Sequence, residues 1–203
     1  RDSVYTLSWH VSGERFASGG NDRSVKIWEL SERVRDAIRA SIDAADQLER
    51  DETVEELAVI GNSMEQFPIF SSKKAHVHCV DCVAFIGDLL STKSTEGKIR
   101  LWLPVLEQTR TALGTLPKPP PCELRLLRTF EYEDSDVYFL RFAFDAKSKL
   151  LAYGNVYGVV HIWRLTSDAS PVKTMRLPRQ STIRYMCFSP DGTTLVAATD
   201  DGS

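Results

Sequence analysis

The sequence repeats one pattern of short strands and turns four times. Each repeat starts with a run of β-branched and aromatic residues, and further runs follow after turns of Gly, Asp, Asn or Ser. The repeats start at residues 4, 80, 137 and 183. Short runs separated by such turn residues are typical of antiparallel strands and not of helices. The chain is therefore predicted to be all-β.

A tryptophan lies at the same place in the first three repeats. Each follows a turn position by six residues, and the three are Trp28, Trp102 and Trp163. A constant offset predicts that these side chains occupy equivalent positions in the third strand of three repeated sheets. The units resemble WD repeats, in which a fourth, outer strand follows the Trp. The resemblance places outer strands at 66–71, 124–130 and 172–177.

The resemblance to WD repeats implies a β-propeller, in which about 4–8 four-stranded sheets, or blades, close into a ring. The whole chain, residues 1–203, is expected to lie in one propeller. It would supply about three and a half blades of a seven-bladed ring, with the remaining blades elsewhere in the protein.

Two long insertions are expected between the third and fourth strands of their blades, at 31–65 and 104–122. In the first, apolar residues recur at helical spacing from Val34 to Ile42, and Ser31 stands in an N-cap position. The acidic residues that follow predict a solvated segment. The second contains a proline-rich stretch, typical of a stiff spacer. Both insertions should lie on one face, as surface decoration or as a partner-binding element.

The first strands of the four repeats share a second regularity. They align on an aromatic residue, and the residue four positions earlier is aromatic or charged. The aligned aromatics are Trp9, Phe85, Phe142 and Phe188, and the earlier residues are Tyr5, Asp81, Tyr138 and Arg184. This position should lie at the mouth of the central channel. Two readings remain open, a ligand-binding site and a polar network that satisfies itself around a wet channel.

Composition excludes several functions. The net charge is −3 and the pI about 5.9, so no basic field favours direct nucleic-acid or anionic-membrane binding. No stretch approaches the roughly 20 consecutive apolar residues of a membrane span, and no signal peptide is visible. The four scattered cysteines favour the cytosol or nucleus over a disulfide framework. Because no catalytic motif is present, the chain is predicted to be non-enzymatic and to need no cofactor.

One cluster could be read as a metal or redox site. His76, His78, Cys79 and Cys82 lie within seven residues. The two cysteines fall in or just before a predicted strand, where side chains three apart point to opposite faces. No second Cys pair completes a set of four ligands. A structural role is therefore preferred over metal binding.

Several segments together resemble one WD-repeat family. They are Phe-Pro-Ile-Phe-Ser at 67–71, Val-Asp-Cys-Val at 80–83, Gly-Asp-Leu at 87–89 and Asp-Val-Tyr-Phe-Leu-Arg-Phe at 136–142. These segments are similar to the Extra sex combs (EED) family, the WD-repeat subunits of Polycomb repressive complex 2. The resemblance covers the whole chain in order.

The resemblance implies a nuclear, non-catalytic reader of a histone H3 tail with a trimethylated lysine. An adjacent Trp-Tyr pair of the family's aromatic cage falls here on Tyr138 and Phe139, and the other two cage residues fall before residue 1. Arg141, Asp81 and Arg184 match residues that line the same pocket. Because Trp is the best partner for a quaternary ammonium, Tyr-Phe predicts a weaker cage.

The resemblance also implies partners. A SET-domain histone methyltransferase subunit would dock on the opposite face, and other Polycomb subunits would join the complex. No membrane and no sequence-specific nucleic acid is expected. A generic WD-repeat adaptor in ubiquitin ligation or signalling remains the alternative, with a cryptic metalloprotein as a third reading.

Overall fold

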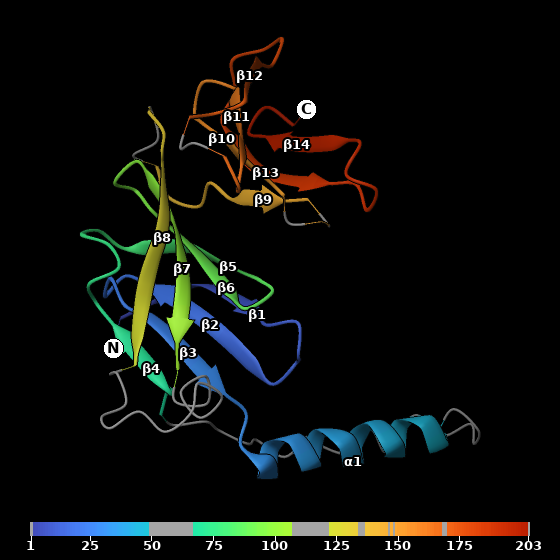
Figure 1. The fold of residues 1–203 in the computed structure, drawn as a ribbon. Helices are drawn as coiled ribbons and strands as arrows, with labels where there is room; N and C mark the ends of the chain where they lie inside the picture. The colour runs from blue at the N-terminus through green and yellow to red at the C-terminus, as the bar shows by residue number, and fades with distance from the viewer. Residues whose placement is uncertain are drawn as a thin grey trace.

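The computed structural model describes residues 2–48, 67–106, 122–133, 137–145, 147, 149–167 and 170–202. These residues form antiparallel sheets that follow one another along the chain (Figure 1). The first sheet holds β1 (Val4–Trp9), β2 (Arg15–Gly20), β3 (Val25–Glu29) and β4 (Phe70–Ser72). The second holds β5 (Val80–Ile86), β6 (Leu89–Ser94), β7 (Lys98–Val105) and β8 (Glu123–Glu131).

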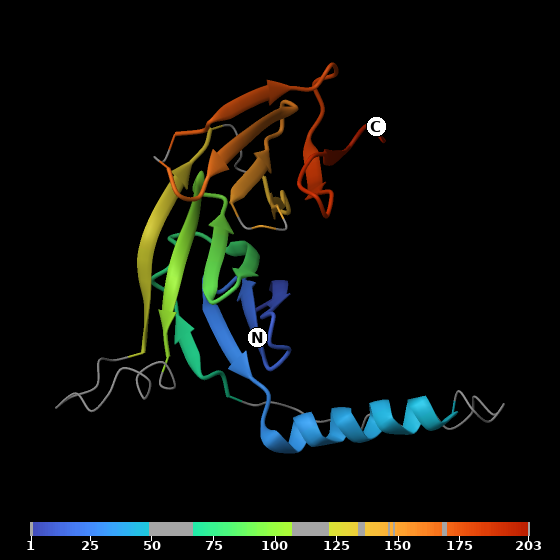
Figure 2. The ribbon, with the colours of Figure 1, turned by 45° about the vertical axis from the view of Figure 1, so that its right-hand side comes forward.

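The third sheet holds β9 (Phe142–Phe144), β10 (Leu150–Gly154), β11 (Val159–Arg164) and β12 (Lys173–Arg176). The fourth holds β13 (Ile183–Phe188) and β14 (Leu195–Thr199). In Figure 2 the sheets stand one after another along an arc, as blades of a propeller do. The predicted all-β propeller architecture is confirmed.

The three tryptophans occupy equivalent positions in their sheets, as predicted. Each pairs with the second residue of the second strand of its sheet. The pairs are Trp28 with Phe16, Trp102 with Leu90 and Trp163 with Leu151. The six-residue offset therefore reports a common register.

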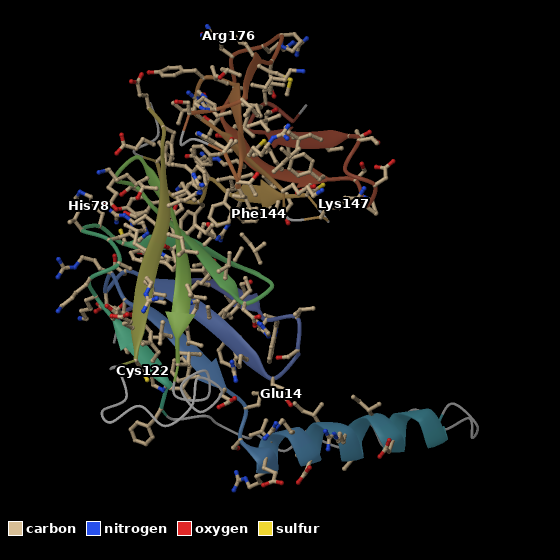
Figure 3. The ribbon with its side chains drawn as sticks, viewed as in Figure 1. Glu14, His78, Cys122, Phe144, Lys147 and Arg176 are labelled. Carbon is tan, nitrogen blue, oxygen red and sulfur yellow. The ribbon has the colours of Figure 1, made fainter. Side chains whose placement is uncertain are left out.

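The apolar cores lie between neighbouring sheets. Ile27 of β3 and Val83 of β5 belong to the core between the first and second sheets. On β10, Tyr153 belongs to the core shared with the second sheet, whereas the preceding Ala152 belongs to the core shared with the fourth. Strand alternation thus sends successive side chains into two different cores. Figure 3 shows side chains filling the space between the sheets.

A helix, α1 (Glu32–Leu48), connects β3 to β4 and extends away from the sheets (Figure 1). Val34 is buried, whereas Ile42 is 55% exposed. The helix continues past Ile42 to Leu48, through a sequence rich in good helix formers, and Asp43, the first of the acidic residues predicted to be solvated, is exposed. No helix among the described residues is long and apolar enough to cross a membrane.

The described bounds of the two insertions differ from the sequence-based ones. Residues 49–66 and 107–121, which hold most of the acidic run and the proline-rich stretch, lie outside the described residues. Before the second insertion, β7 extends to Val105, one residue past the predicted start of that insertion at residue 104. The outer strand β4 begins at Phe70, because its pairing reaches only three residues of β3.

The His76 segment takes part in a buried hydrogen-bond network. Thr92 lies at its centre, 2.7 Å from the imidazole of His76 and 2.8 Å from the indole nitrogen of Trp102. Glu96 binds the other imidazole nitrogen and the guanidinium of Arg100. In the described part of the chain, no group of three or more His, Cys, Asp or Glu could hold a metal ion. His76 thus links β6, through Thr92, to the turn between β6 and β7, through Glu96.

The first strand of the third sheet differs from the prediction. The expected strand over 137–142 is replaced by a turn at Tyr138 and Phe139, and β9 begins only at Phe142. Phe144, and not Phe142, pairs with Leu151 and closes the strand. The third sheet is therefore shifted by two residues from the register assumed in the alignment.

Candidate functional site

Three inner strands carry an irregularity at the same place. The register shifts within β1, β5 and β13, each time leaving one residue beside the regular pairing. Those residues are Tyr5, Asp81 and Arg184. A bulge breaks the ladder and re-aims the residues around it. The predicted equivalence of these three residues is confirmed, whereas Tyr138 lies in a turn and does not share the position.

Arg141 joins the three bulges. Its guanidinium donates hydrogen bonds to the carbonyl of Asp81 at 2.6 Å and to the carbonyl of Tyr5 at 3.2 Å. Its backbone N–H donates to the carbonyl of Arg184 at 3.1 Å. Carbonyls that leave a ladder need another donor, and this one residue supplies it three times. Arg141 therefore fixes the spacing of the inner strands where the site lies.

The turn before Arg141 has an unusual backbone. Phe139 has a φ of 63°, a left-handed conformation that costs a non-glycine residue about 1–3 kcal/mol. Its N–H donates to a carboxylate oxygen of Asp81 at 2.8 Å, and the carbonyl of Tyr138 accepts from Arg184 at 3.2 Å. These contacts from β5 and β13 offset the strain and hold the turn.

Three aromatic rings meet beside this turn. The ring of Tyr5 lies edge-on to both Phe139 and Tyr138, with centroids 5.4 and 6.3 Å apart, and the last two are 6.1 Å apart. Tyr138 is 44% exposed and Phe139 is 47% exposed, so a ligand can reach both. A hydrogen bond with the Cys79 side chain raises the pKa of Tyr138 above its ordinary value, which further favours the neutral phenol.

Tyr5 completes this aromatic cluster, which we define as Tyr5, Tyr138 and Phe139. Its hydroxyl donates a hydrogen bond of 3.1 Å to the side chain of Asn21, which follows β2, and this bond fixes the position of the Tyr5 ring. Sequence reasoning aligned Tyr5 with the channel mouth but did not include it among the site residues. Its aromatic character at a position shared with Asp81 and Arg184 was the available signal.

The charged residues of the site are engaged with one another. Asp81 is fully buried, and both of its carboxylate oxygens accept from the ammonium of Lys93, at 3.0 and 2.9 Å. Lys93, which sequence reasoning missed, is also fully buried. Arg184 makes a two-point ion pair with Asp200, at 2.7 and 2.8 Å. The hydrogen bonds that Arg184 donates to Asp200 raise the pKa of Arg184.

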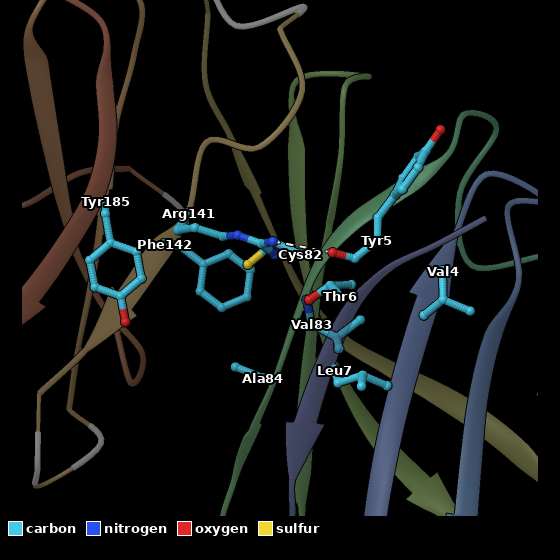
Figure 4. A pocket seen from close by; sticks show the side chains of 10 residues that line it. All are labelled: Val4, Tyr5, Thr6, Leu7, Cys82, Val83, Ala84, Arg141, Phe142 and Tyr185. Carbon is cyan, nitrogen blue, oxygen red and sulfur yellow. Dashed lines mark hydrogen bonds between the residues drawn. The ribbon is translucent and has the colours of Figure 1, made fainter. Parts of the chain in front are cut away.

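A cavity of about 560 Å³ opens between the inner strands at the foot of the aromatic cluster (Figure 4). Arg141, Phe142 and Tyr185 line one side in Figure 4, and residues of β1 and β5 line the other. The dashed line in Figure 4 marks the hydrogen bond from Arg141 to the Tyr5 carbonyl. The lining combines apolar side chains with the guanidinium of Arg141 and with the hydroxyl-bearing residues Tyr5, Thr6 and Tyr185.

Comparison with protein families supports the repeat assignment. The family described as WD domain, G-beta repeat, matches residues 1–29 and 169–203. Three solved structures have the same fold at low sequence identity. An active polycomb repressive complex 2 in the basal state has a TM-score of 0.69 at 16% identity, over 98% of this chain and 61% of that chain. The β-propeller domain of Cps50 (Swd1) from Myceliophteria thermophila has a TM-score of 0.65 at 14% identity, over 99% and 49%.

The third is a polycomb repressive complex 2 solved with trimethylated histone H3, with a TM-score of 0.70 at 16% identity, over 98% of this chain and 61% of that chain.

Sequence relatives extend along the whole chain. Polycomb protein esc is 29% identical in Drosophila virilis and 32% identical in Musca domestica, over all of this chain and 47% and 46% of those proteins. Polycomb group protein FIE2 of Zea mays is 30% identical over all of this chain and 49% of that protein. The chain spans about half the length of these relatives. It forms blades of a WD-repeat β-propeller and is homologous to Polycomb protein esc over its full length.

Proposed function

We propose that this chain is part of a non-catalytic, nuclear histone-reading scaffold in a Polycomb-type histone H3 methyltransferase complex. The aromatic cluster of Tyr5, Tyr138 and Phe139 would bind a trimethylated lysine side chain. Arg141, Asp81 and Arg184 would shape the site by holding the turn and the inner strands. The homology to Polycomb esc proteins and the fold shared with Polycomb repressive complex 2 support this assignment.

The exposed aromatic cluster is the observation that carries the proposal. A trimethylammonium has no N–H to donate, so a carboxylate cannot recognise it by hydrogen bonding. Aromatic faces attract it through their quadrupole, with a gain of about 0.5–2 kcal/mol for each favourable contact. Tyr5 of β1 and the turn residues Tyr138 and Phe139 supply three rings that meet at one place.

The protein partners follow from the two faces of the propeller. Successive strands of a blade alternate in direction, so the end of β3 lies on the face opposite the start of β1 and Tyr5. Helix α1 leaves from that opposite face. We assign this face to the SET-domain methyltransferase subunit, and the aromatic face to the histone H3 tail.

Peptide titration of the full-length protein tests the reader function. A histone H3 peptide with a trimethylated lysine should bind more tightly than the same peptide without methyl groups. Replacing one ring, Phe139→Ala, should weaken the trimethylated peptide by about 1–2 kcal/mol, or roughly five- to thirtyfold. Tyr157→Ala is the matched control, because Tyr157 is 50% exposed in another turn of the same sheet. Equal affinity of the wild-type protein for both peptides would leave only the WD-repeat adaptor reading.

A further inference from the structure

A buried acid lies directly under the aromatic cluster. Asp81 is fully buried and accepts the N–H of Phe139 at 2.8 Å. Its negative charge also contributes to the raised pKa of Tyr138. A free carboxylate at this place would attract any cation that enters the cluster, with or without methyl groups.

Lys93 removes that attraction. Its ammonium binds both oxygens of Asp81, at 3.0 and 2.9 Å, and lies 5.7 Å from the ring centre of Tyr153. Both partners of the pair have no solvent exposure, so water screens neither charge. The acid and the ammonium thus cancel each other beneath the cluster.

Lys93 stands at a position where the other sheets have small residues. Lys93 pairs with Cys82, the residue after the bulge of β5. In the first sheet the residue after the bulge is Thr6, and it pairs with Gly19, which is therefore the counterpart of Lys93. At Gly19 a Cβ atom would lie 2.6 Å from Val80, because the next inner strand packs closely there. In the second sheet this position holds the long side chain of Lys93. The inner strand of the next sheet, β9, begins only at Phe142, after the position of the bulge in the other sheets. The turn of Tyr138 and Phe139 occupies the chain before it.

We propose that Lys93 is a specificity-determining residue of the aromatic cluster. By neutralising Asp81, it leaves the cluster to distinguish lysine side chains by their methyl groups and not by their charge or N–H donors. An unmethylated ammonium is smaller, more strongly hydrated and richer in donors, so an uncompensated carboxylate would favour it over a trimethylammonium. This inference rests on the proposed reader function and names the residue that sets its selectivity.

Two variants of Lys93 in the full-length protein test the inference. Lys93→Met removes the cation, and Lys93→Gln also removes the charge but keeps an N–H donor for Asp81. Each is titrated with trimethylated and unmethylated H3 peptides after its fold is checked by circular dichroism. In both variants the preference for the trimethylated peptide should fall by about tenfold, mainly because the unmethylated peptide binds more tightly. If Lys93→Met does not fold, Lys93→Gln decides the test; if neither folds, a preference in the charge-free Asp81→Asn, Lys93→Met variant that differs from that of the wild type overturns the inference.

A second-site variant separates this role from a merely structural one. Asp81→Asn with Lys93→Met removes both charges and keeps an acceptor for the Phe139 N–H, so the wild-type preference should return. Lys98→Met is the matched control, since Lys98 is a partly exposed lysine of the same sheet that pairs with Glu131 at 3.5 Å. Equal weakening of both peptides by Lys93→Met and Lys93→Gln, with the preference unchanged, would overturn the inference. Lack of preference in the wild-type protein would instead overturn the reader function on which it rests.

Discussion

The backbone N–H of Arg141 donates a hydrogen bond of 3.1 Å to the carbonyl of Arg184, which joins the third sheet to the fourth. The side chain of Arg141 reaches in the other direction, to the carbonyls of Tyr5 and Asp81. One residue therefore ties together inner strands of all four sheets.

Replacing Arg141 should destabilise the fold. Arg141→Leu leaves the carbonyls of Tyr5 and Asp81 without this donor, and each unsatisfied buried group costs about 1–3 kcal/mol. The free energy of unfolding, measured with urea on the full-length protein, should fall by about 2–4 kcal/mol. Arg125→Leu serves as control, because its side chain is 59% exposed and contacts Glu123 only at 3.5 Å. A similar small loss for both variants would mean that Arg141 does not hold the strands together.

Two glycines should not tolerate a side chain. A Cβ on Gly19 would lie 2.6 Å from the side chain of Val80, and a Cβ on Gly154 would lie 2.6 Å from Ile183. Overpacking of this kind costs about 1–3 kcal/mol, so Gly19→Ala and Gly154→Ala should both lower the melting temperature. Combining Gly19→Ala with Val80→Ala should cost less than the sum of the single variants. Simple additivity would show that the contact with Val80 is not the cause.

The hydroxyl of Thr92 should matter more than that of its counterpart in the first sheet. Thr92 Oγ1 contacts both His76 and Trp102, whereas Ser18 Oγ accepts from Trp28 at 2.9 Å. Thr92→Val leaves two buried polar groups unsatisfied and should cost about 2–4 kcal/mol. Ser18→Ala should cost about 1 kcal/mol, because the indole of Trp28 is only half-buried. Chemical denaturation of the two variants compares them, and equal losses would argue against a special role for the Thr92 network.

Acid should weaken the second sheet through Glu96. Burial alone would raise the pKa of Glu96, but hydrogen bonds and charges from His76 and Arg100, together with the Val77 N–H, hold it at about 2. The ordinary value is 4.5, so the folded state favours the carboxylate. Its contribution is present above about pH 4.5 and is lost as the pH falls toward about 2. Burial also lowers the pKa of His76, which makes acid unfavourable to the fold in the same direction.

Urea denaturation at several pH values measures this effect. The stability difference between wild type and Glu96→Gln should be present at neutral and mildly acid pH and should shrink as the pH falls below about 4.5. Glu131→Gln provides the comparison, since the side chain of Glu131 is 73% exposed. A difference between wild type and Glu96→Gln that does not change with pH would show that the Glu96 charge does not contribute to stability.

Most of the architecture could be predicted because it follows from short-range patterns. The constant offset of the tryptophans reports a register that the strand pairs reproduce. The apolar spacing from Val34 predicts the start of α1, and the helix continues to Leu48 through good helix formers. Local sequence thus determines which segments become strands or helix.

The third inner strand could not be predicted in this way. A slip of two residues keeps every side chain on the same face of a strand, so the alternating pattern cannot distinguish Phe142 from Phe144 as the closing residue. The turn before it depends on Asp81, which is distant in sequence and hydrogen bonds to Phe139. Lys93 was missed for a related reason, because nothing in its own strand indicates a buried charge. Only tertiary contacts decide these positions.

The placement of the cores between the sheets has a consequence for how such a ring can change over time. A sheet shares each core with a neighbour, as Ala152 and Tyr153 show on opposite faces of β10. The unit that must stay complementary over time is therefore the core between two neighbouring sheets. A change of side-chain size on one face of a sheet can be compensated only by residues of the sheet that shares that core. Helix α1 leaves the sheets beyond those cores, and only its start, with Val34 buried and Arg35 paired with Glu14, is held against them.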